Sequence, residues 1–298
     1  MMDVLPSILT PVLINAIAVL GLYLIAASGR ISAGHAAFFG IGGYASGLIS
    51  IRLGLPPLVS VALGMIVAAL CGAAFALVAD RLSHWFFAVT TLAFAVMIIS
   101  LVSSFDALGG ATGLYGIPIA TGLKEVAFAL ILAVGFVVWL DSTHFGRAMR
   151  AVRDSEPAAQ ALAINPMYVR AVAYALGTGL AGFAGGLWSH YLGLIKPADM
   201  SLDRSLLYLI YLSIGGIDHW IGALFGTFLL DLLPEFIRFS RGYRFVVFGG
   251  LLALVMVLRP SGLISHDEID KLKRAWRLIA RRFYLKETKA PFGPTSMM

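Results

Sequence analysis

The stretch LPPLVSVALGMIVAALCGAAFALVA, residues 55–79, contains no charged side chain over its whole length. A run of about twenty apolar residues forms a helix long enough to cross the hydrocarbon core of a bilayer. Small residues recur here at every fourth position, at Gly64, Ala68, Gly72 and Ala76. Such a stripe lets helix backbones approach each other closely in lipid. The stretch therefore predicts a membrane-spanning helix that packs within a bundle.

The same apolar pattern extends in both directions along the chain. Hydrophobic residues make up 59% of the sequence and charged residues only 13%, a balance outside that of soluble domains. Further long apolar segments cover residues 8–27, 85–102, 126–140, 169–194 and 245–258. The strands of a membrane β-barrel would alternate apolar and polar residues, which these continuous runs do not. The sequence predicts an all-α, polytopic membrane helix bundle.

Two glycine-interrupted segments decide the number of crossings. If residues 33–51 cross once and residues 206–230 cross twice as short helices, the chain crosses about nine times, within a range of roughly eight to ten. Either segment could instead be broken or re-entrant. With nine crossings, Arg30, Arg81 and the arginines of the central loop share one side with the basic tail, and the positive-inside rule makes that side the cytoplasm. The N-terminus is then outside and the C-terminus inside.

The polar stretch GRAMRAVRDSEPAAQALAINP, residues 146–166, interrupts these apolar segments. Asp154 or Ser155 can cap a helix here, and the alanines that follow have high helix propensity. The Asn165-Pro166 pair predicts where this helix ends, because the residue before a proline avoids the helical region. A helix of about nine residues spans roughly 13 Å, too short to cross a bilayer. It therefore lies along the membrane surface.

The composition of this surface helix suits a docking surface. Alanines present a face of low bulk, and Leu162 offers one apolar side chain. A helix that faced only water would not need such a face. An ordinary solvated connector remains the alternative, because loops between membrane helices are often charged.

Several sequence motifs resemble those of one protein family, both in their residues and in their order along the chain. They are SGRISAGHAAFFGIGGYASGL at residues 28–48, the loop at 146–165, AYALGTGLAGFAGGLW at 173–188, IGG at 214–216 and LRPSGLI at 258–264. The chain from about residue 20 to residue 264 resembles the permeases of branched-chain amino-acid ABC importers, of the LivM type. One departure follows the IGG step, where Ile217-Asp218-His219-Trp220 replaces a short Gly-rich turn.

The resemblance implies a function and a set of partners. Residues 1–264 would form half of a translocation pathway beside a second, LivH-like permease subunit, in a bacterial inner membrane. A periplasmic or extracellular substrate-binding protein would deliver the solute, and two ATPase subunits would bind ATP and magnesium. The loop would insert into the ATPase as a coupling helix. The residues carried over for that contact are Gly146, Arg147, Arg150, Arg153, Glu156, Ala158, Ala159, Leu162 and Asn165.

Motifs for chemistry are absent from the sequence. There is no G-x-x-x-x-G-K-[ST] phosphate loop and no H-E-x-x-H zinc motif, and Cys71 is the single cysteine. We therefore expect a transport subunit with no catalytic residue, bound cofactor or metal. The alternative is a stand-alone secondary carrier or channel. An ion-coupled carrier would need an Asp or Glu within the membrane, whereas we expect Asp106 and Asp231 to lie at helix ends or in loops.

A pathway is predicted where helices break, because half-helix ends supply polar groups without buried charge. Residues 34–47 and 215–226 each carry an Ile-Gly-Gly step followed by a glycine pair. The candidate pathway residues are Ser32, Gly34, His35, Phe38, Phe39, Gly42, Gly43, Tyr44, Gly215 and Gly216. Close helix packing, with His35 satisfied by a backbone carbonyl, is the alternative explanation of the same residues.

The C-terminal part carries a separate signal. Ser265 and Glu268 match a capping box, and apolar residues then recur opposite basic ones up to residue 290. This pattern predicts a basic amphipathic helix at 265–290 on the cytoplasmic leaflet, with contact to a protein partner as the alternative. Residues 291–298 are expected to be disordered. The net charge of +6 follows from this tail and the loops, so it does not indicate nucleic acid.

Overall fold

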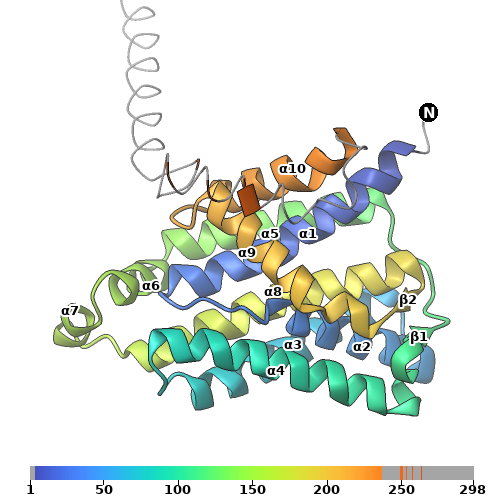
Figure 1. Cartoon of the computed structure of the whole chain (residues 1–298), viewed down its shortest axis with the longest axis horizontal. Coiled ribbons are helices and arrows are strands. Elements are labelled where there is room, and N and C mark those ends of the chain that lie inside the picture. Colours follow the sequence, from blue (N-terminus) through green and yellow to red (C-terminus); the bar gives the residue numbers. More distant parts are fainter. Residues whose placement is uncertain (1–3, 237–248, 251–252, 254–256, 258–262, 264–298) are drawn as a thin grey trace, which may run out of the picture.

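The computed structural model describes residues 4–236 and positions 249, 250, 253, 257 and 263. Within these residues, six helices are long and apolar enough to cross a membrane. They are α1 (Val4–Ala27), α2 (His35–Leu53), α3 (Pro57–Ala79), α4 (His84–Ser104), α5 (Leu123–Ser142) and α8 (Pro166–Leu192). The helices run alongside one another as a single bundle (Figure 1). The all-α, polytopic architecture expected from the sequence is confirmed.

Helix α8 lies at the centre of the bundle, packed against α1, α2 and α3. The small-residue stripe of α3, from Gly64 to Ala76, is buried in this packing. A Cβ atom added at Gly72 would overlap the side chain of Thr178 on α8. The stripe therefore serves helix packing, as the sequence predicts.

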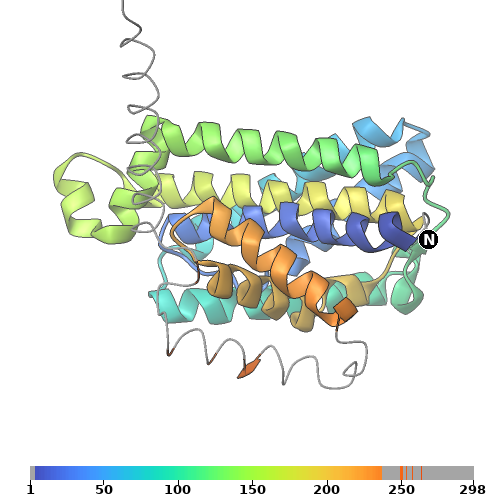
Figure 2. The same ribbon diagram turned by 90° about the horizontal axis from the view of Figure 1, so that it is seen from above.

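The two ends of the bundle differ in structure. At one end, η1 (Asp106–Leu108), η2 (Gly110–Thr112) and η3 (Pro197–Met200) surround the short strands β1 (Leu114–Tyr115) and β2 (Leu194–Ile195). The strands pair antiparallel, with Leu114 opposite Ile195. We call this end the β1–β2 end. At the other, the α7 end, the short helices α6 (His144–Asp154) and α7 (Glu156–Ala161) project beyond the bundle (Figure 2).

Helices α9 (Leu202–Gly215) and α10 (Trp220–Phe236) form the two short helices expected within residues 206–230. They are bent by 117° at the break between them, so the pair forms one broken span or a re-entrant loop in place of the two crossings expected, and we call it the broken span. Each is shorter than the roughly 20 residues that a full crossing needs. Gly216 ends α9 at a φ of 117°, a backbone conformation that favours glycine.

The other glycine-rich segment is not broken, which agrees with the single crossing expected of residues 33–51 but not with the break expected within residues 34–47. Residues 35–53 form one continuous helix, α2. A Cβ atom added at Gly42 would overlap the backbone of Gly182 on α8. The glycines of α2 therefore allow two helices to touch backbone to backbone, and they do not interrupt either helix.

Some expectations lie outside the described residues. These are most of the span at 245–258, the amphipathic helix at 265–290 and the tail at 291–298.

Candidate functional site

The α7 end carries the loop that the sequence singles out as a coupling helix. Ser155 caps α7, since its side chain accepts a hydrogen bond from the backbone N–H of Ala158 at 3.4 Å. The helix is shorter than expected and ends at Ala161, with Ala163 at a φ of 58°. Asn165 does not end α7. Its side chain accepts from Tyr168 N at 3.3 Å and caps the next helix, α8, because the proline that follows fits the first turn of a helix.

Only some of the predicted coupling residues face outward. Leu162 is 73% exposed and Ala158 is exposed beside it, while Tyr168 at the start of α8 is 64% exposed. Ala159 is 1% exposed, so it packs inward instead of contributing to an outer small-residue face. Gly146 is also buried, and a Cβ atom there would lie 2.5 Å from the carbonyl oxygen of Leu140. The exposed surface at the end of this loop is thus apolar and centred on Leu162, and we call it the apolar tip.

The three loop arginines bind groups of this chain. Arg147 donates to the backbone oxygen of Ser142 at 3.1 Å. Arg150 pairs with Asp141 on α5 at 3.3 Å, and Asp141 also accepts from Tyr23 on α1 at 2.9 Å. These contacts fix α6 to the ends of α1 and α5.

Arg153 connects the loop to the broken span. It pairs with Asp154 at 3.1 Å and with Asp218 at 3.3 Å. Asp218 lies in the turn between α9 and α10, where the sequence departs from the family pattern. His219 in the same turn accepts at Nδ1 from the backbone N–H of Ile221 at 3.2 Å. Asp218 and His219, where the sequence departs from the family pattern, thus supply an ion pair and a cap for α10. The sequence alone did not suggest either role.

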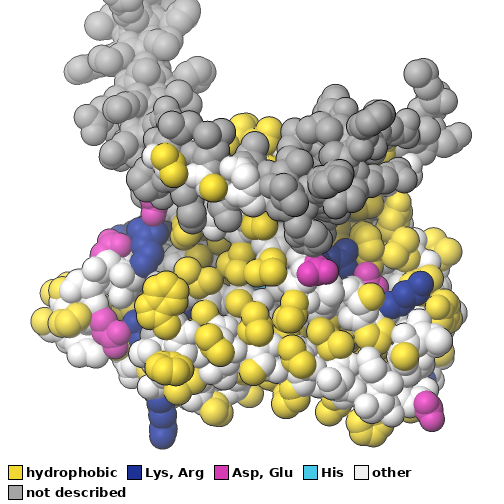
Figure 3. Space-filling model, viewed as in Figure 1, with side chains coloured by type: hydrophobic (Ala, Val, Ile, Leu, Met, Phe, Trp, Pro, Cys, Tyr) yellow, Lys and Arg dark blue, Asp and Glu magenta, His cyan; other side chains and the backbone are white. Residues whose placement is uncertain are grey.

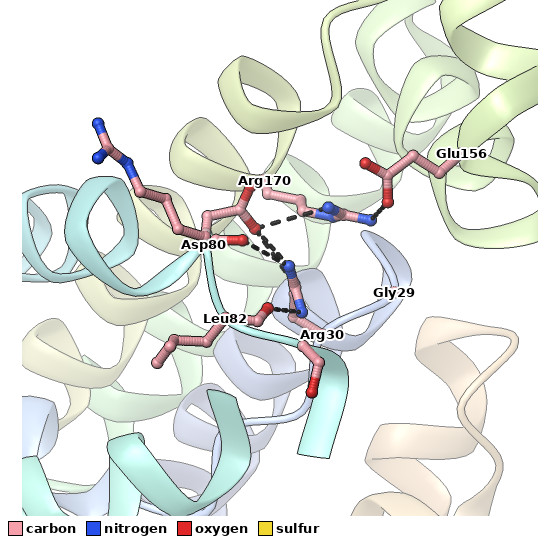
Figure 4. Close-up of a pocket in the computed structure, with 8 residues that line it drawn as sticks. Gly29, Arg30, Asp80, Leu82, Glu156 and Arg170 are labelled. Atoms are coloured by element: carbon pink, nitrogen blue, oxygen red, sulfur yellow. Dashed lines mark hydrogen bonds and ion pairs between the residues drawn. The ribbon is translucent and has the colours of Figure 1, made fainter. Parts of the chain in front are cut away.

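A charge network connects α7 with α8, the end of α3 and the loop after α1 (Figure 4). Arg30, in the loop between α1 and α2, donates from Nη2 to Asp80 Oδ1 at 2.9 Å, and both side chains are less than one tenth exposed. Arg170 on α8 reaches the same carboxylate oxygen at 3.6 Å and Glu156 on α7 at 2.7 Å. Asp80 therefore joins α3 to two arginines. One of these arginines is in turn bound to α7.

The network borders a cavity of about 450 Å³. Its walls are formed by Gly29, Arg30, Asp80, Arg81, Leu82, Ser83, Glu156 and Arg170. Arg30 and Arg81 thus meet at the α7 end, as the charge pattern of the sequence predicts. The sequence did not single out Asp80 or Arg170, because the members of the network come from separate segments of the chain.

The candidate pathway residues of α2 and of the loop before it lie inside the subunit. Ser32, His35, Phe38, Phe39 and Tyr44 are each 4% exposed or less. Two of these residues bind neighbouring helices: His35 Nε2 lies 3.0 Å from the backbone oxygen of Ala18, and Ser32 Oγ lies 2.9 Å from Tyr174 Oη. Gly34, Gly43 and Gly215 are likewise in close contact with neighbouring backbone or side chains. These contacts favour the packing explanation for most of this set.

Polar side chains instead gather along α9 and α10. Asp231 lies within α10 and accepts from Asn15 on α1 at 2.6 Å and from Tyr211 on α9 at 2.9 Å. Tyr208 donates to the amide oxygen of Asn15 at 3.2 Å. The expectation that Asp231 belongs to a helix end or loop was wrong, because α10 continues to residue 236. Asp106 does lie between helices, in η1.

The comparisons with known proteins agree with this architecture. Residues 4–258 match the family described as the permease component of branched-chain amino acid transport systems. The chain is 27% identical to the high-affinity branched-chain amino acid transport system permease protein LivM of Escherichia coli, over 87% of this chain and 69% of the relative. It is 27% identical to the probable LivM of Methanocaldococcus jannaschii, over 78% and 79%.

The second permease of such systems is also related to the chain. The LivH permease of Escherichia coli is 28% identical over 49% of this chain and 47% of its own length. No solved structure matches the chain. The resemblance inferred from the motifs is confirmed by the match over residues 4–258. The chain therefore belongs to the family of branched-chain amino acid transport system permease components.

Proposed function

We propose that this chain forms half of the pathway of an ATP-driven importer for branched-chain or related amino acids. As a member of the permease family it is a transport subunit of an ABC importer and a multi-pass membrane protein. A second, LivH-like permease supplies the other half. Two separate ATPase subunits dock at the α7 end in the cytoplasm, and a substrate-binding protein docks at the β1–β2 end.

The observation that carries this proposal is the apolar tip at Leu162. A side chain that is 73% exposed on a short projecting helix has no packing role within the subunit. The arginines of the α7 end match the positive-inside rule, so the tip faces the cytoplasm. An exposed apolar side chain surrounded by polar residues suits insertion into a groove on a partner protein.

The charge network explains how a movement of α7 reaches the membrane helices. Glu156 on α7 is bound to Arg170 on α8, and Arg170 contacts Asp80 at the end of α3. Arg153, at the end of α6 just before α7, forms a second connection, to the turn between α9 and α10. Displacing α7 would therefore pull on α3, α8 and the broken span together.

The Leu162→Arg variant tests the docking role. We expect it to fold and to lose a co-purifying ATPase, because a charged side chain cannot fill an apolar groove without a large desolvation cost. The measurement is purification of the tagged chain in mild detergent, followed by mass spectrometry of the proteins that come with it. Gln160→Arg is the matched control, since it adds the same charge at an exposed position of the same helix.

Two outcomes would contradict the proposal. An ATPase retained at the wild-type level in Leu162→Arg would exclude Leu162 from the docking surface. A wild-type chain that purifies alone, yet moves solute across vesicles without ATP, would instead support a stand-alone carrier or channel.

A further inference from the structure

An arginine lies against two aromatic rings near the β1–β2 end. The guanidinium carbon of Arg204, in the first turn of α9, lies 4.5 Å from the ring centre of Phe39 and 4.4 Å from that of Trp188. Trp188 is one turn from the end of α8, so the charge lies within the bundle, close to this end. The two ring centres are 6.3 Å apart, so the guanidinium contacts two adjacent rings, and these contacts limit its movement.

Only part of this guanidinium is occupied. Its Nη1 donates to the backbone oxygen and to Oδ1 of Asp199, both at 3.2 Å. Asp199 also accepts from Trp188 Nε1 at 3.2 Å and from the backbone N–H of Lys196 at 2.9 Å. Among the described residues, no hydrogen bond uses Nε or Nη2 of Arg204. The edge formed by these two nitrogens therefore retains two parallel donors, the arrangement that binds a carboxylate in bidentate fashion.

The pair is open to the surface of the subunit. The side chains of Asp199 and Arg204 are 17% and 16% exposed, and Asp203 beside them is exposed. On this face, acidic and basic side chains gather at the β1–β2 end among large hydrophobic ones (Figure 3). Ionisable groups at membrane depth face a water-filled cavity or a second subunit, because exposure to lipid is costly. This face is therefore the one that meets the pathway.

We propose that Arg204 receives the carboxylate of the solute where it enters the pathway from the β1–β2 end. The Nε and Nη2 edge of Arg204 binds the two carboxylate oxygens. Asp199 holds the guanidinium in place from the opposite edge. The site selects a free amino acid over urea or an amide, which lack a carboxylate. This inference rests on the proposed import function and specifies its substrate class.

The test is ATP-dependent uptake of L-leucine by the complete transporter in proteoliposomes. Arg204→Lys keeps the charge beside the rings but loses the two parallel donors, so we expect its uptake rate to fall about tenfold or more, as does that of Arg204→Gln. Arg52→Gln is the matched control, an exposed arginine at the same end, and should transport normally.

Assembly yield and ATP hydrolysis are measured on the same samples, and both should stay within about twofold of wild type. Full uptake by Arg204→Lys would overturn the inference, because charge and stacking would then suffice. If the Arg204 variants take up leucine as fast as wild type, and wild-type uptake depends on ATP, only this inference fails. A wild type without ATP-dependent uptake would overturn the proposed function, and this inference with it.

Discussion

Replacing Gly185 with alanine is expected to prevent the bundle from assembling. A Cβ atom at this position on α8 would overlap the carbonyl oxygen of Phe39 on α2 and lie 3.2 Å from the backbone nitrogen of Gly43. Backbone atoms of a helix cannot turn aside as a flexible side chain can. The two helices must therefore separate, and the cost is about 3 kcal/mol or more, at the upper end of the range for overpacking.

The measurement for Gly185→Ala is the yield of monodisperse protein in mild detergent, together with its apparent melting temperature. Gly135→Ala is the matched control, because Gly135 is exposed on α5 and a Cβ atom there meets nothing within 4 Å. We expect the control to be neutral or more stable by up to about 1 kcal/mol, since alanine favours a helix over glycine. Equal yields and melting temperatures for the two variants would contradict the backbone contact between α2 and α8.

Among the described residues, the sequence was sufficient to predict the six membrane helices and to place Arg30, Arg81 and the loop arginines at one end of the bundle. Both depend on local properties, the length of an apolar run and the position of charges between runs. The stripe that begins at Gly64 likewise predicted close packing. It did not identify α8 as the partner, because the residues that approach it, such as Gly182, are more than a hundred positions away along the chain.

The pathway was harder to predict for a physical reason. A glycine-rich segment can mark either a broken helix or a close backbone contact, and residues 34–47 fit both descriptions. The structure shows a continuous helix there and a break only at Gly216. The partly exposed polar groups instead follow α9, where Arg204 depends on rings supplied by Phe39 and Trp188. No local pattern in the sequence connects these three residues.

Replacing Asp80 with asparagine is expected to destabilise the folded chain severely. Asparagine has almost the same shape, so the main change is the loss of the negative charge that Arg30 and Arg170 share. The side chains of these arginines are only 7% and 11% exposed, so water compensates little of the missing charge. Removing one partner of a buried ion pair costs about 3–5 kcal/mol, because the other charge stays buried without compensation.

The Asp80→Asn prediction is checked by the apparent melting temperature in detergent, beside Asp154→Asn. Asp154 also pairs with an arginine, but its side chain is 67% exposed, so its loss should cost less than about 1 kcal/mol. Equal melting temperatures would show that solvent screens the Asp80 network after all. A variant that folds but hydrolyses ATP without importing solute would separate the two roles of Asp80. Since Arg170 joins Asp80 to Glu156 on α7, that result would mean that the network transmits motion more than it supports the fold.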